Sequence, residues 1–311
     1  MNVGDLRARA VDLSFAAGWG AVKALPSPLA RRAFRTVADV ATVRNGKGAQ
    51  QLRKNLRRVV PQASDAELDE LVGEGLRSYA RYWLETFRLP KMDPRAVAAN
   101  AEANTTGDEH IDEATRAGKG FILALPHMGN WDAAAIWLVA HCGSFTTVAE
   151  RLKPESLYDR FVAYRESLGM EVLPLTGGAS PAETLAERLR AGRAVCLLAD
   201  RDLSRNGVEV EFFGEGTRMP GGPALLAATT GAALLPVSLW FTPDGGWGQW
   251  IGPPIELTGK RLAEKVRAGT QALATVFETR IAEHPSDWHM LQKLWLSDLS
   301  VRTAPLNGHR H

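Results

Sequence analysis

Apolar side chains recur at helical spacing through the first ninety residues of the chain. Val11, Phe15, Trp19 and Val22 fall within an arc of roughly 80° on a predicted helix over residues 5–25. The same pattern predicts helices over residues 29–43, 50–60 and 64–87, and Ser64-Asp-Ala-Glu67 forms a capping box at the start of the last one. We therefore expect a helical segment over residues 1–90.

After residue 98 the pattern changes to short apolar runs that alternate with helical stretches. The runs cover residues 121–125, 145–148, 171–175, 194–199, 208–213, 233–240 and 247–255. The helical stretches cover residues 132–140, 157–168, 182–191, 222–230 and 261–283. This alternation is typical of an α/β fold with an open, largely parallel or mixed central sheet flanked by helices. We expect one domain over residues 1–311, with the helical layer at 1–90 and the α/β core at 98–300.

The composition is that of a globular protein with a large core. Of the 311 residues 45% are hydrophobic and 23% are charged. Two cysteines in apolar surroundings, Cys142 and Cys196, indicate reduced thiols and a cytosolic protein. No apolar run approaches the roughly 20 residues that span a bilayer, and charged residues near the amino terminus argue against an export signal.

The charge is unevenly distributed along the chain. The net charge is +2, yet residues 1–60 carry twelve Lys or Arg against three acids. A basic segment favours an anionic partner, either nucleic acid or the negatively charged leaflet of a membrane. Aromatic stacking positions are missing among the basic residues, so no nucleic-acid partner is expected. The apolar stripe then has two interpretations: a surface that docks on a membrane, or a helical layer packed on the core.

The stretch over residues 118–132 carries the strongest catalytic candidate. A buried strand over residues 121–125 is followed by a loop with His127, by the helix cap Asn130, and by Asp132 in the first helical turn. In the loop, the His127 imidazole can be oriented by the Asp132 carboxylate as a general base. Backbone N–H groups near Asn130 and Trp131 are candidates to hold an oxyanion. The alternative is a structural histidine and an acid that merely complements the helix dipole.

Other polar residues also follow predicted strands, where sites form in parallel α/β sheets. They are Glu150, Asp200, Asp202 and the glycine-rich stretch with Thr217 and Arg218, whose side chains suit a phosphate. The sequence lacks a Gly-x-Ser-x-Gly elbow, a Walker loop, a Rossmann fingerprint and metal-ligand spacing among its histidines. Base catalysis on a substrate hydroxyl is the chemistry that remains, and we expect neither a metal nor a cofactor.

Several motifs resemble those of the glycerolipid and lysophospholipid acyltransferase superfamily. His127, four residues and Asp132 match its signature, and Glu215-Gly-Thr-Arg218 resembles its phosphate-binding block. Five further blocks are similar, in the same order, to those of the bacterial lipid A acyltransferase branch: Leu198-Ala-Asp-Arg-Asp202, Phe212-Phe-Gly214, Gly222-Pro-Ala-Leu-Leu226, residues 231–236 and His284-Pro-Ser-Asp-Trp288. Together they cover about residues 70–300, and the likeness is strongest to actinobacterial phosphatidylinositol mannoside acyltransferases. Asp132 departs from the branch's common Glu, and Arg201 from its common Gln.

The resemblance implies a peripheral enzyme on the cytoplasmic face of the inner membrane. It implies transfer of a fatty acyl chain, palmitoyl in most cases, from acyl-CoA as co-substrate to a mannose hydroxyl of a phosphatidylinositol mannoside at an anionic membrane surface. Alternatives within the fold are a lipid A precursor or a lysophospholipid as acceptor, and an acyl-CoA thioesterase in which His127 activates water. A non-catalytic lipid-binding protein is a further alternative, against which the intact pair of His127 and Asp132 argues.

The resemblance also implies roles for further residues. Glu150 and Arg165 look like additional site residues, and Arg165 either meets the phosphates of the donor or pairs with Glu150. Asp200 and Asp202 either bind sugar hydroxyls or pair with Arg201 and Arg218. His284 is expected at the acceptor site. Candidates for the acyl groove are Trp131, Trp137, Leu138, Phe161 and Leu168.

Overall fold

A seven-stranded sheet forms the centre of the protein, in the order β1-β9-β8-β2-β5-β3-β4. The computed structural model describes residues 20, 22–151, 155–175, 180–203 and 206–299. The strands of the sheet are β1 (Thr105–Thr106), β2 (Phe121–Leu125), β3 (Phe145–Ala149), β4 (Met170–Pro174), β5 (Ala194–Leu198), β8 (Ala233–Phe241) and β9 (Trp247–Ile251). All neighbouring strands run parallel except the antiparallel pair of β8 and β9. The predicted α/β class with a largely parallel, mixed sheet is confirmed.

Strand β2 lies at the centre because every one of its residues is apolar and buried. A strand covered on both faces needs apolar side chains on both, which is why it reads as a continuous run and not as an alternation. β2 pairs with β5 on one side and with β8 on the other. Two polar residues that follow β2 and β5 at equal distance are therefore brought side by side at the carboxyl edge of the sheet.

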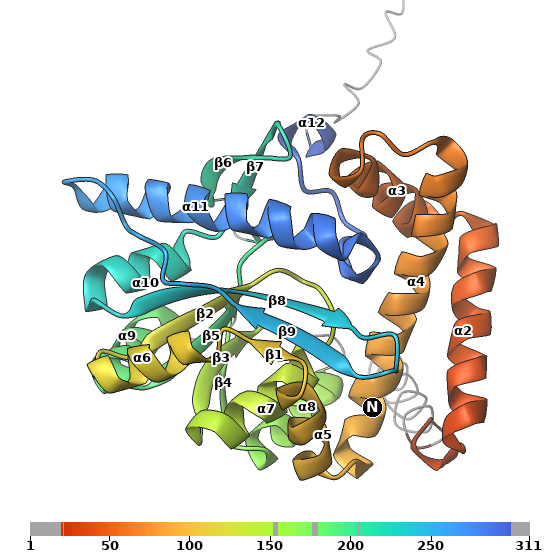
Figure 1. The fold of residues 1–311 in the computed structure, drawn as a ribbon, viewed down its shortest axis with the longest axis horizontal. Helices are drawn as coiled ribbons and strands as arrows, with labels where there is room; N and C mark the ends of the chain where they lie inside the picture. Colours follow the sequence, from red (N-terminus) through yellow and green to blue (C-terminus); the bar gives the residue numbers. More distant parts are fainter. Residues whose placement is uncertain (1–19, 21, 152–154, 176–179, 204–205, 300–311) are drawn as a thin grey trace, which may run out of the picture.

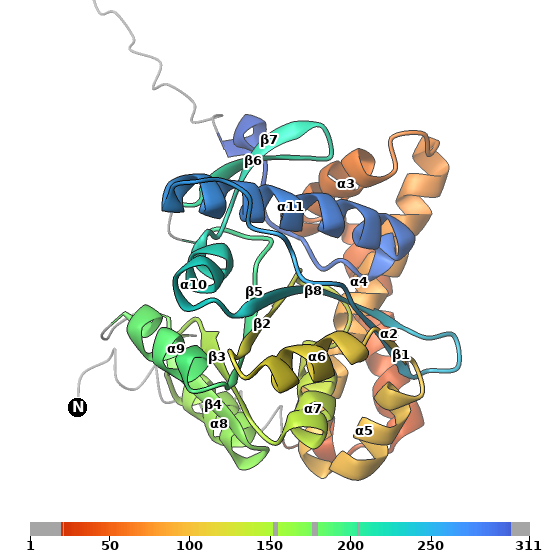
Figure 2. The same ribbon diagram turned by 60° about the vertical axis from the view of Figure 1, so that its left-hand side comes forward.

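Helices cover both faces of the sheet and its carboxyl edge. In Figure 1, α10 and α11 lie over one face and α5, α7 and α8 over the other, while α4 stands at the edge towards which β8 points. The α-helices described are α2 (Ser27–Arg44), α3 (Lys47–Val59), α4 (Asp65–Arg88), α5 (Pro94–Glu102), α6 (Glu109–Ala117), α7 (Trp131–Cys142), α8 (Glu155–Ser167), α9 (Pro181–Arg190), α10 (Gly222–Thr230), α11 (Leu262–Glu283) and α12 (Leu296–Leu299). Two short 3-10 helices are η1 (Leu89–Lys91) and η2 (Pro285–Asp287). The rotated view in Figure 2 shows α2 and α3 flanking α4.

The long helix α4 begins as the sequence predicted. The Ser64 hydroxyl accepts from the Glu67 backbone N–H, and the Glu67 carboxylate accepts from the Ser64 N–H, so the capping box is confirmed. Such reciprocal bonds satisfy amide groups that have no partner inside the helix. The predicted boundaries of the helical layer and of the single domain stay predictions.

The glycine-rich block over residues 214–222 is partly a strand. β6 (Val208–Phe212) and β7 (Glu215–Met219) pair as an antiparallel hairpin outside the main sheet. Gly214 lies between them with φ of +74°, a conformation that glycine adopts without strain. The apolar run over residues 208–213 predicted a strand, and the structure places that strand in the hairpin, where α11 packs on it.

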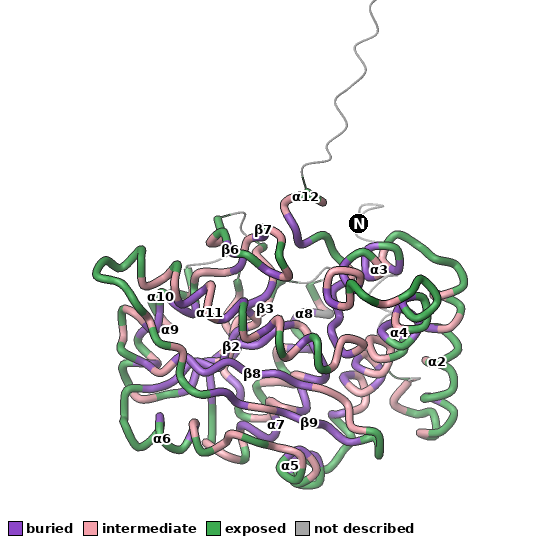
Figure 3. The backbone as a smooth tube through the Cα atoms, turned by 45° about the horizontal axis from the view of Figure 1, so that its top comes forward, coloured by how far each residue is buried: buried purple, intermediate pink, exposed green. Residues whose placement is uncertain are grey.

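Buried residues concentrate in the central layer of the fold, and exposed residues lie on the outer helices. Figure 3 shows buried backbone concentrated in the central strands and exposed backbone along α2. Among the described residues, no helix combines the length and the apolar character needed to cross a membrane.

Candidate active site

His127 meets Asp200 at the carboxyl edge of the sheet. The two atoms His127 Nδ1 and Asp200 Oδ1 are 2.5 Å apart, and the His127 backbone N–H donates to Asp200 Oδ2 at 2.9 Å. Leu125 of β2 is paired with Leu198 of β5, and His127 and Asp200 each follow two residues later. The strand register therefore creates this contact.

The Asp200 carboxyl group is buried and has no exposed surface. Burial alone would raise the pKa of Asp200, but the His127 ring and the N–H groups of His127 and Trp288 outweigh it and hold the pKa below its ordinary value. Because a carboxylate only accepts, the proton of the ring lies on Nδ1 and the lone pair on Nε2. Within the part of the chain that the structure describes, His127 Nε2 has no hydrogen-bond partner. The side chain is 27% exposed, so this nitrogen is placed to act as a base.

Asp132 does not contact the imidazole, which corrects the expectation that it orients His127. Its Oδ1 accepts from Arg165 at 2.8 Å, and its Oδ2 accepts from the Tyr82 and Thr86 hydroxyls at 3.3 Å. The carboxylate points from the first turn of α7 towards α4 and α8. Spacing along the chain allowed the contact with His127, but β5 places Asp200 on the ring instead.

Arg165 pairs with Asp132 and not with Glu150. The guanidinium is 18% exposed, and although burial would lower the pKa of Arg165, the Asp132 carboxylate raises it above the usual value. Glu150 is exposed after β3 and has no hydrogen-bond or ion-pair partner among the described residues. Arg165 is thus held inside the protein, which corrects the expected pairing with Glu150.

Helix α4 supplies side chains that sequence reasoning missed. Glu85 Oε2 accepts from Asn130 Nδ2 and from Trp247 Nε1, both at 2.7 Å. Asn130 Oδ1 in turn accepts from the Asp132 and Ala133 N–H groups and caps α7, as the sequence predicted. The signal was present in α4: Ser78, Tyr82, Glu85 and Thr86 recur at a spacing of three and four residues, so they share one helical face.

The loop between β2 and α7 follows a path that depends on glycine. Gly129 has φ of +58°, and a Cβ there would lie 2.7 Å from the Leu239 carbonyl carbon of β8. Its N–H donates to the Asp287 carbonyl at 2.9 Å. Glycine is the residue that tolerates both the left-handed conformation and the close approach.

The His284–Trp288 block lies near the loop that carries His127, but residues other than His284 make the contacts with that loop. The His284 ring stacks on Trp240 with centroids 4.6 Å apart, and burial lowers the pKa of His284. Trp288 Nε1 donates to Asp200 Oδ2 at 3.0 Å, and the His289 N–H donates to the His127 carbonyl at 2.8 Å. Binding of the acceptor by His284 stays a prediction.

Buried His289 lies beside the same loop. Its Nε2 is 2.9 Å from the Ser78 hydroxyl, which donates to Asp287 Oδ1 at 2.6 Å. Burial, followed by the charge of His127, lowers the pKa of His289 to about 3, so the ring is neutral at neutral pH.

The predicted phosphate block is used for packing. The Thr217 hydroxyl is buried and donates to the Leu294 carbonyl at 2.7 Å, so the expected role of Thr217 in phosphate binding is corrected. Arg218 pairs with Glu209 on the neighbouring strand at 2.6 Å and is 40% exposed. Phosphate binding by Arg218 stays a prediction.

The two residues that follow Asp200 lie apart from the pair of His127 and Asp200. Asp202 Oδ2 accepts from the Gly207 N–H at 2.8 Å and shapes its own loop. Arg201 is half-buried and makes no side-chain hydrogen bond or ion pair with a residue that the structure describes. Sugar binding by Arg201 and Asp202 stays a prediction, whereas Asp200 is engaged by His127.

A small apolar cavity of about 30 Å³ lies between α7 and the sheet, next to Trp131. β2, β5, β8 and β9 line it on one side and α7 on the other, where Trp131, Trp137 and Leu138 contribute. Their part in an acyl groove stays a prediction. The Trp131 ring stands edge-on to His127 with centroids 5.8 Å apart. Phe161 does not line this cavity but packs near Trp83 and Phe87, which corrects its expected place. Leu168 does not line it either.

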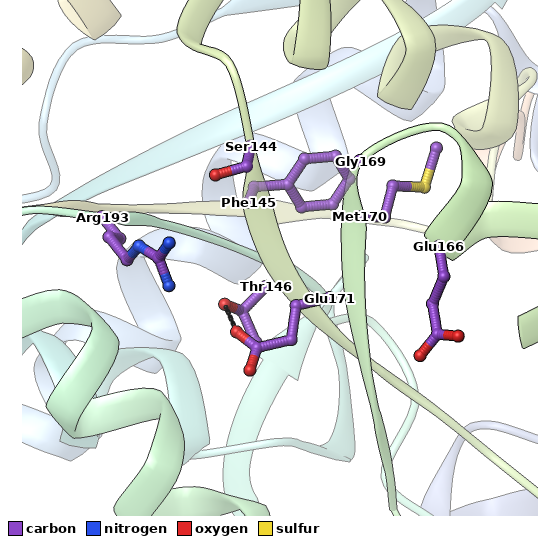
Figure 4. A pocket seen from close by; sticks show the side chains of 8 residues that line it. All are labelled: Ser144, Phe145, Thr146, Glu166, Gly169, Met170, Glu171 and Arg193. Atoms are coloured by element: carbon purple, nitrogen blue, oxygen red, sulfur yellow. Dashed lines mark hydrogen bonds between the residues drawn. The ribbon is translucent and has the colours of Figure 1, made fainter.

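A second pocket lies at the opposite, amino-terminal edge of the sheet. Figure 4 shows Ser144, Thr146 and Glu171 around it, with Arg193 to one side. The hydrogen bonds from Arg188, followed by that from Thr146, outweigh burial and lower the pKa of Glu171 to about 2. This carboxylate is satisfied within the fold. Among the described residues, no group of three His, Cys, Asp or Glu side chains is arranged to hold a metal ion.

Comparison with known proteins matches most of the chain. The family model described as bacterial lipid A biosynthesis acyltransferase matches residues 7–297. Proteins named phosphatidylinositol mannoside acyltransferase are similar in two strains of Mycobacterium tuberculosis, with 56% identity over 292 residues, covering 94% of this chain and 90% of each relative. One from Mycolicibacterium smegmatis is 53% identical over 296 residues, covering 95% and 94%. The chain therefore belongs to the bacterial lipid A biosynthesis acyltransferase family.

Proposed function

We propose that the protein transfers a fatty acyl chain, preferably palmitoyl, from acyl-CoA to a mannose hydroxyl of a phosphatidylinositol mannoside. The observation that best supports this proposal is the partly exposed imidazole of His127. It is held by the buried Asp200 carboxylate and lies near a small apolar cavity. The names of the relatives support the choice of acceptor. Acyl-CoA is a substrate in this reaction, which needs no cofactor.

The chemistry follows from the free nitrogen of His127. Nε2 removes the proton from the mannose hydroxyl as its oxygen attacks the thioester carbonyl, and the resulting imidazolium is stabilised by Asp200. The tetrahedral intermediate then expels the thiolate of coenzyme A, which takes the proton back from His127. General base catalysis of this kind gives about 10²–10⁴-fold.

The start of α7 offers donors for the oxyanion. Asn130 Oδ1 accepts from the Asp132 and Ala133 N–H groups, whereas the N–H groups of Asn130 and Trp131 have no partner among the described residues. We assign these two groups to the intermediate. One well-placed donor is worth about 3 kcal/mol in such a site.

The acyl chain enters between α7 and the sheet, where this small cavity widens to admit it. Trp131 forms its wall next to His127, and Trp137 lies two turns further along α7, where its indole N–H donates to Glu102. A chain in this cavity has its thioester carbonyl at the His127 end. The walls are mostly apolar, as a fatty acid requires.

The membrane face is proposed on α2. Its outer side exposes Leu29, Val37, Val40 and Val43, and Val43 is 86% exposed. Five basic side chains on or beside this helix have no ion-pair partner among the described residues: Arg31, Arg32, Arg35, Arg44 and Lys47. An apolar stripe with basic flanks is typical of a helix that lies in the interface of an anionic membrane, here the cytoplasmic leaflet.

Three basic residues further along α3 do not belong to this face. Arg53 and Arg57 pair with Asp65, and Arg58 pairs with Glu215 and Asp298. The predicted basic segment over residues 50–60 is therefore largely neutralised within the fold. The proposed insertion of Phe15 and Trp19 concerns residues outside those described.

Changing Val37 and Val43 of α2 to Asp is expected to reduce binding to vesicles that contain phosphatidylinositol by about tenfold or more. Each substitution removes an apolar contact worth about 1 kcal/mol and adds a charge that the leaflet repels. Co-sedimentation with vesicles of graded anionic content measures the effect. Leu225→Asp, at an exposed position of α10, is the matched control. Equal binding by the double variant and the control would place the membrane face elsewhere.

The reaction itself is tested with radiolabelled palmitoyl-CoA and three acceptor conditions. We expect label in a phosphatidylinositol mannoside, and none in a lipid A precursor. Rapid release of CoA without acceptor would instead favour a thioesterase. His127→Ala is expected to lower transfer by about 10³-fold or more while the protein stays folded. His141→Ala is the control, because His141 also pairs with an aspartate, Asp112, but lies on the outer part of α7. Turnover retained in His127→Ala would remove His127 from the mechanism.

A further inference from the structure

The second oxygen of the Asp200 carboxylate has a donor of its own from the carboxyl-terminal part of the chain. Oδ1 faces His127 Nδ1, while Oδ2 accepts from the His127 backbone N–H at 2.9 Å and from Trp288 Nε1 at 3.0 Å. An indole N–H can only donate, so this contact favours the ionised carboxylate. Without the indole, a single donor would hold Oδ2.

Trp288 reaches this position because its backbone runs alongside the catalytic loop. Met128 and Trp288 form an antiparallel bridge, the Gly129 N–H donates to the Asp287 carbonyl, and the His289 N–H donates to the His127 carbonyl. The residues on both sides of Trp288 are thus tied to the residues on both sides of Met128. These contacts hold the segment against the loop.

The indole ring is also fixed by its neighbours. Trp288 has no exposed surface, and Phe212 and Trp295 stand edge-on to it with centroids 6.1 and 6.2 Å away. These packed rings support the indole in the orientation that directs its N–H at Asp200. The donor is therefore aimed at Asp200 before any substrate binds.

We propose that Trp288 is a positioning residue for the acyl transfer, whose indole N–H fixes the Asp200 carboxylate so that Oδ1 faces the His127 ring. This rests on the proposed function, in which His127 is the base. Trp288 acts through Asp200 and contacts no substrate. By fixing Asp200, Trp288 keeps the His127 ring in the tautomer with a free Nε2.

Trp288→Phe tests this, with Trp295→Phe as the matched control. Both indoles are buried, and Trp295 Nε1 donates to the Phe212 carbonyl at 2.9 Å, away from Asp200. Both variants lose one buried hydrogen bond and keep an aromatic ring, so similar losses of thermal stability are expected. The ring that remains at position 295 still packs on Trp288, so the indole N–H of Trp288 stays directed at Asp200 in the control. We expect kcat to fall about tenfold in Trp288→Phe only, with KM unchanged, because a bond to a charged group is lost.

The pH profile separates positioning from packing. Loss of the indole N–H leaves the Asp200 carboxylate more basic. The pair of His127 and Asp200 then holds the proton that it gains at low pH more strongly. The acid limb of kcat/KM is then expected at higher pH in Trp288→Phe and unchanged in Trp295→Phe. In an Asp200→Asn background, Trp288→Phe should cause no further loss of kcat, because Trp288 acts only through the Asp200 carboxylate. The proposal would be overturned if the losses of kcat from Asp200→Asn and Trp288→Phe were additive. It would also be overturned if Trp288→Phe and Trp295→Phe had the same pH profile.

A measurement on the unmutated protein needs neither activity nor a stable variant. The Nε1–H resonance of Trp288 in protein labelled with ¹⁵N-tryptophan is expected to shift with pH as the pair of His127 and Asp200 titrates, while that of Trp295 stays constant. A Trp288 signal that is constant over this range overturns the positioning role, whether or not the variants fold. A signal that titrates in a protein without acyl transfer would retain the positioning role and reject the proposed function.

Discussion

Asp200→Asn is expected to lower kcat by about 10³-fold, with little change in the affinity for acyl-CoA. The neutral amide cannot stabilise the imidazolium of His127, and it offers an N–H that favours the wrong tautomer of the ring. Steady-state kinetics with palmitoyl-CoA and a phosphatidylinositol mannoside measures the loss. Asn keeps the size of the side chain and an oxygen for the Trp288 indole, so the fold should be retained.

Glu171→Gln is the matched control for Asp200→Asn. Glu171 is a carboxylate on β4 whose pKa is lowered, as that of Asp200 is, but it lies at the opposite edge of the sheet. Replacing Glu171 with Gln should change kcat by less than about twofold, because distant sites that share no partners have independent effects. An active Asp200→Asn alongside an inactive Asp132→Asn would return the role of orienting His127 to Asp132, as the sequence first indicated.

Arg165→Met is expected to cost about 3–5 kcal/mol in the free energy of unfolding. The substitution leaves the Asp132 carboxylate buried without its cation, and an uncompensated charge in a protein interior is strongly unfavourable. Thermal or chemical unfolding measures the loss. Removing the charge as well, in Arg165→Met with Asp132→Asn, should restore much of the stability, because Asn keeps an oxygen for the Tyr82 and Thr86 hydroxyls.

An exposed ion pair provides the comparison for Arg165. Arg218→Met breaks the pair with Glu209, whose side chains are 40% and 63% exposed, and should cost less than about 1 kcal/mol. A stable but inactive Arg165→Met protein would contradict a purely structural role for Arg165. It would instead favour contact with the phosphates of the donor.

The position of α4 gives the helical layer a direct part in the active site. Glu85 holds the Asn130 cap, Tyr82 and Thr86 hold Asp132, and Ser78 contacts His289. The same helix packs against α2, on which we propose the membrane face. In the proposed function, the docking helix α2 therefore packs on the helix that supports the His127 loop.

Local patterns predicted the elements of the fold well. The buried run of β2, the capping box of α4 and the Asn130 cap of α7 each depend on residues within a few positions of one another, and the structure confirms them. The block over residues 215–218 was predicted as a ligand loop and is a strand. Its pairing with β6 depends on the hairpin and on contacts with Leu294 and Arg58 that lie far away in sequence.

The sequence by itself determined the layered α/β architecture, the loop that carries His127, and the apolar residues of α7 that line the cavity. These follow from periodicity, caps and breakers, which act over a few residues. Only the tertiary structure decided which carboxylate meets the histidine. The pairing of β2 with β5 places Asp200 on the ring, and the packing of α4 and α8 turns Asp132 towards Arg165. Strand order is a long-range property, so no local spacing could reveal that choice.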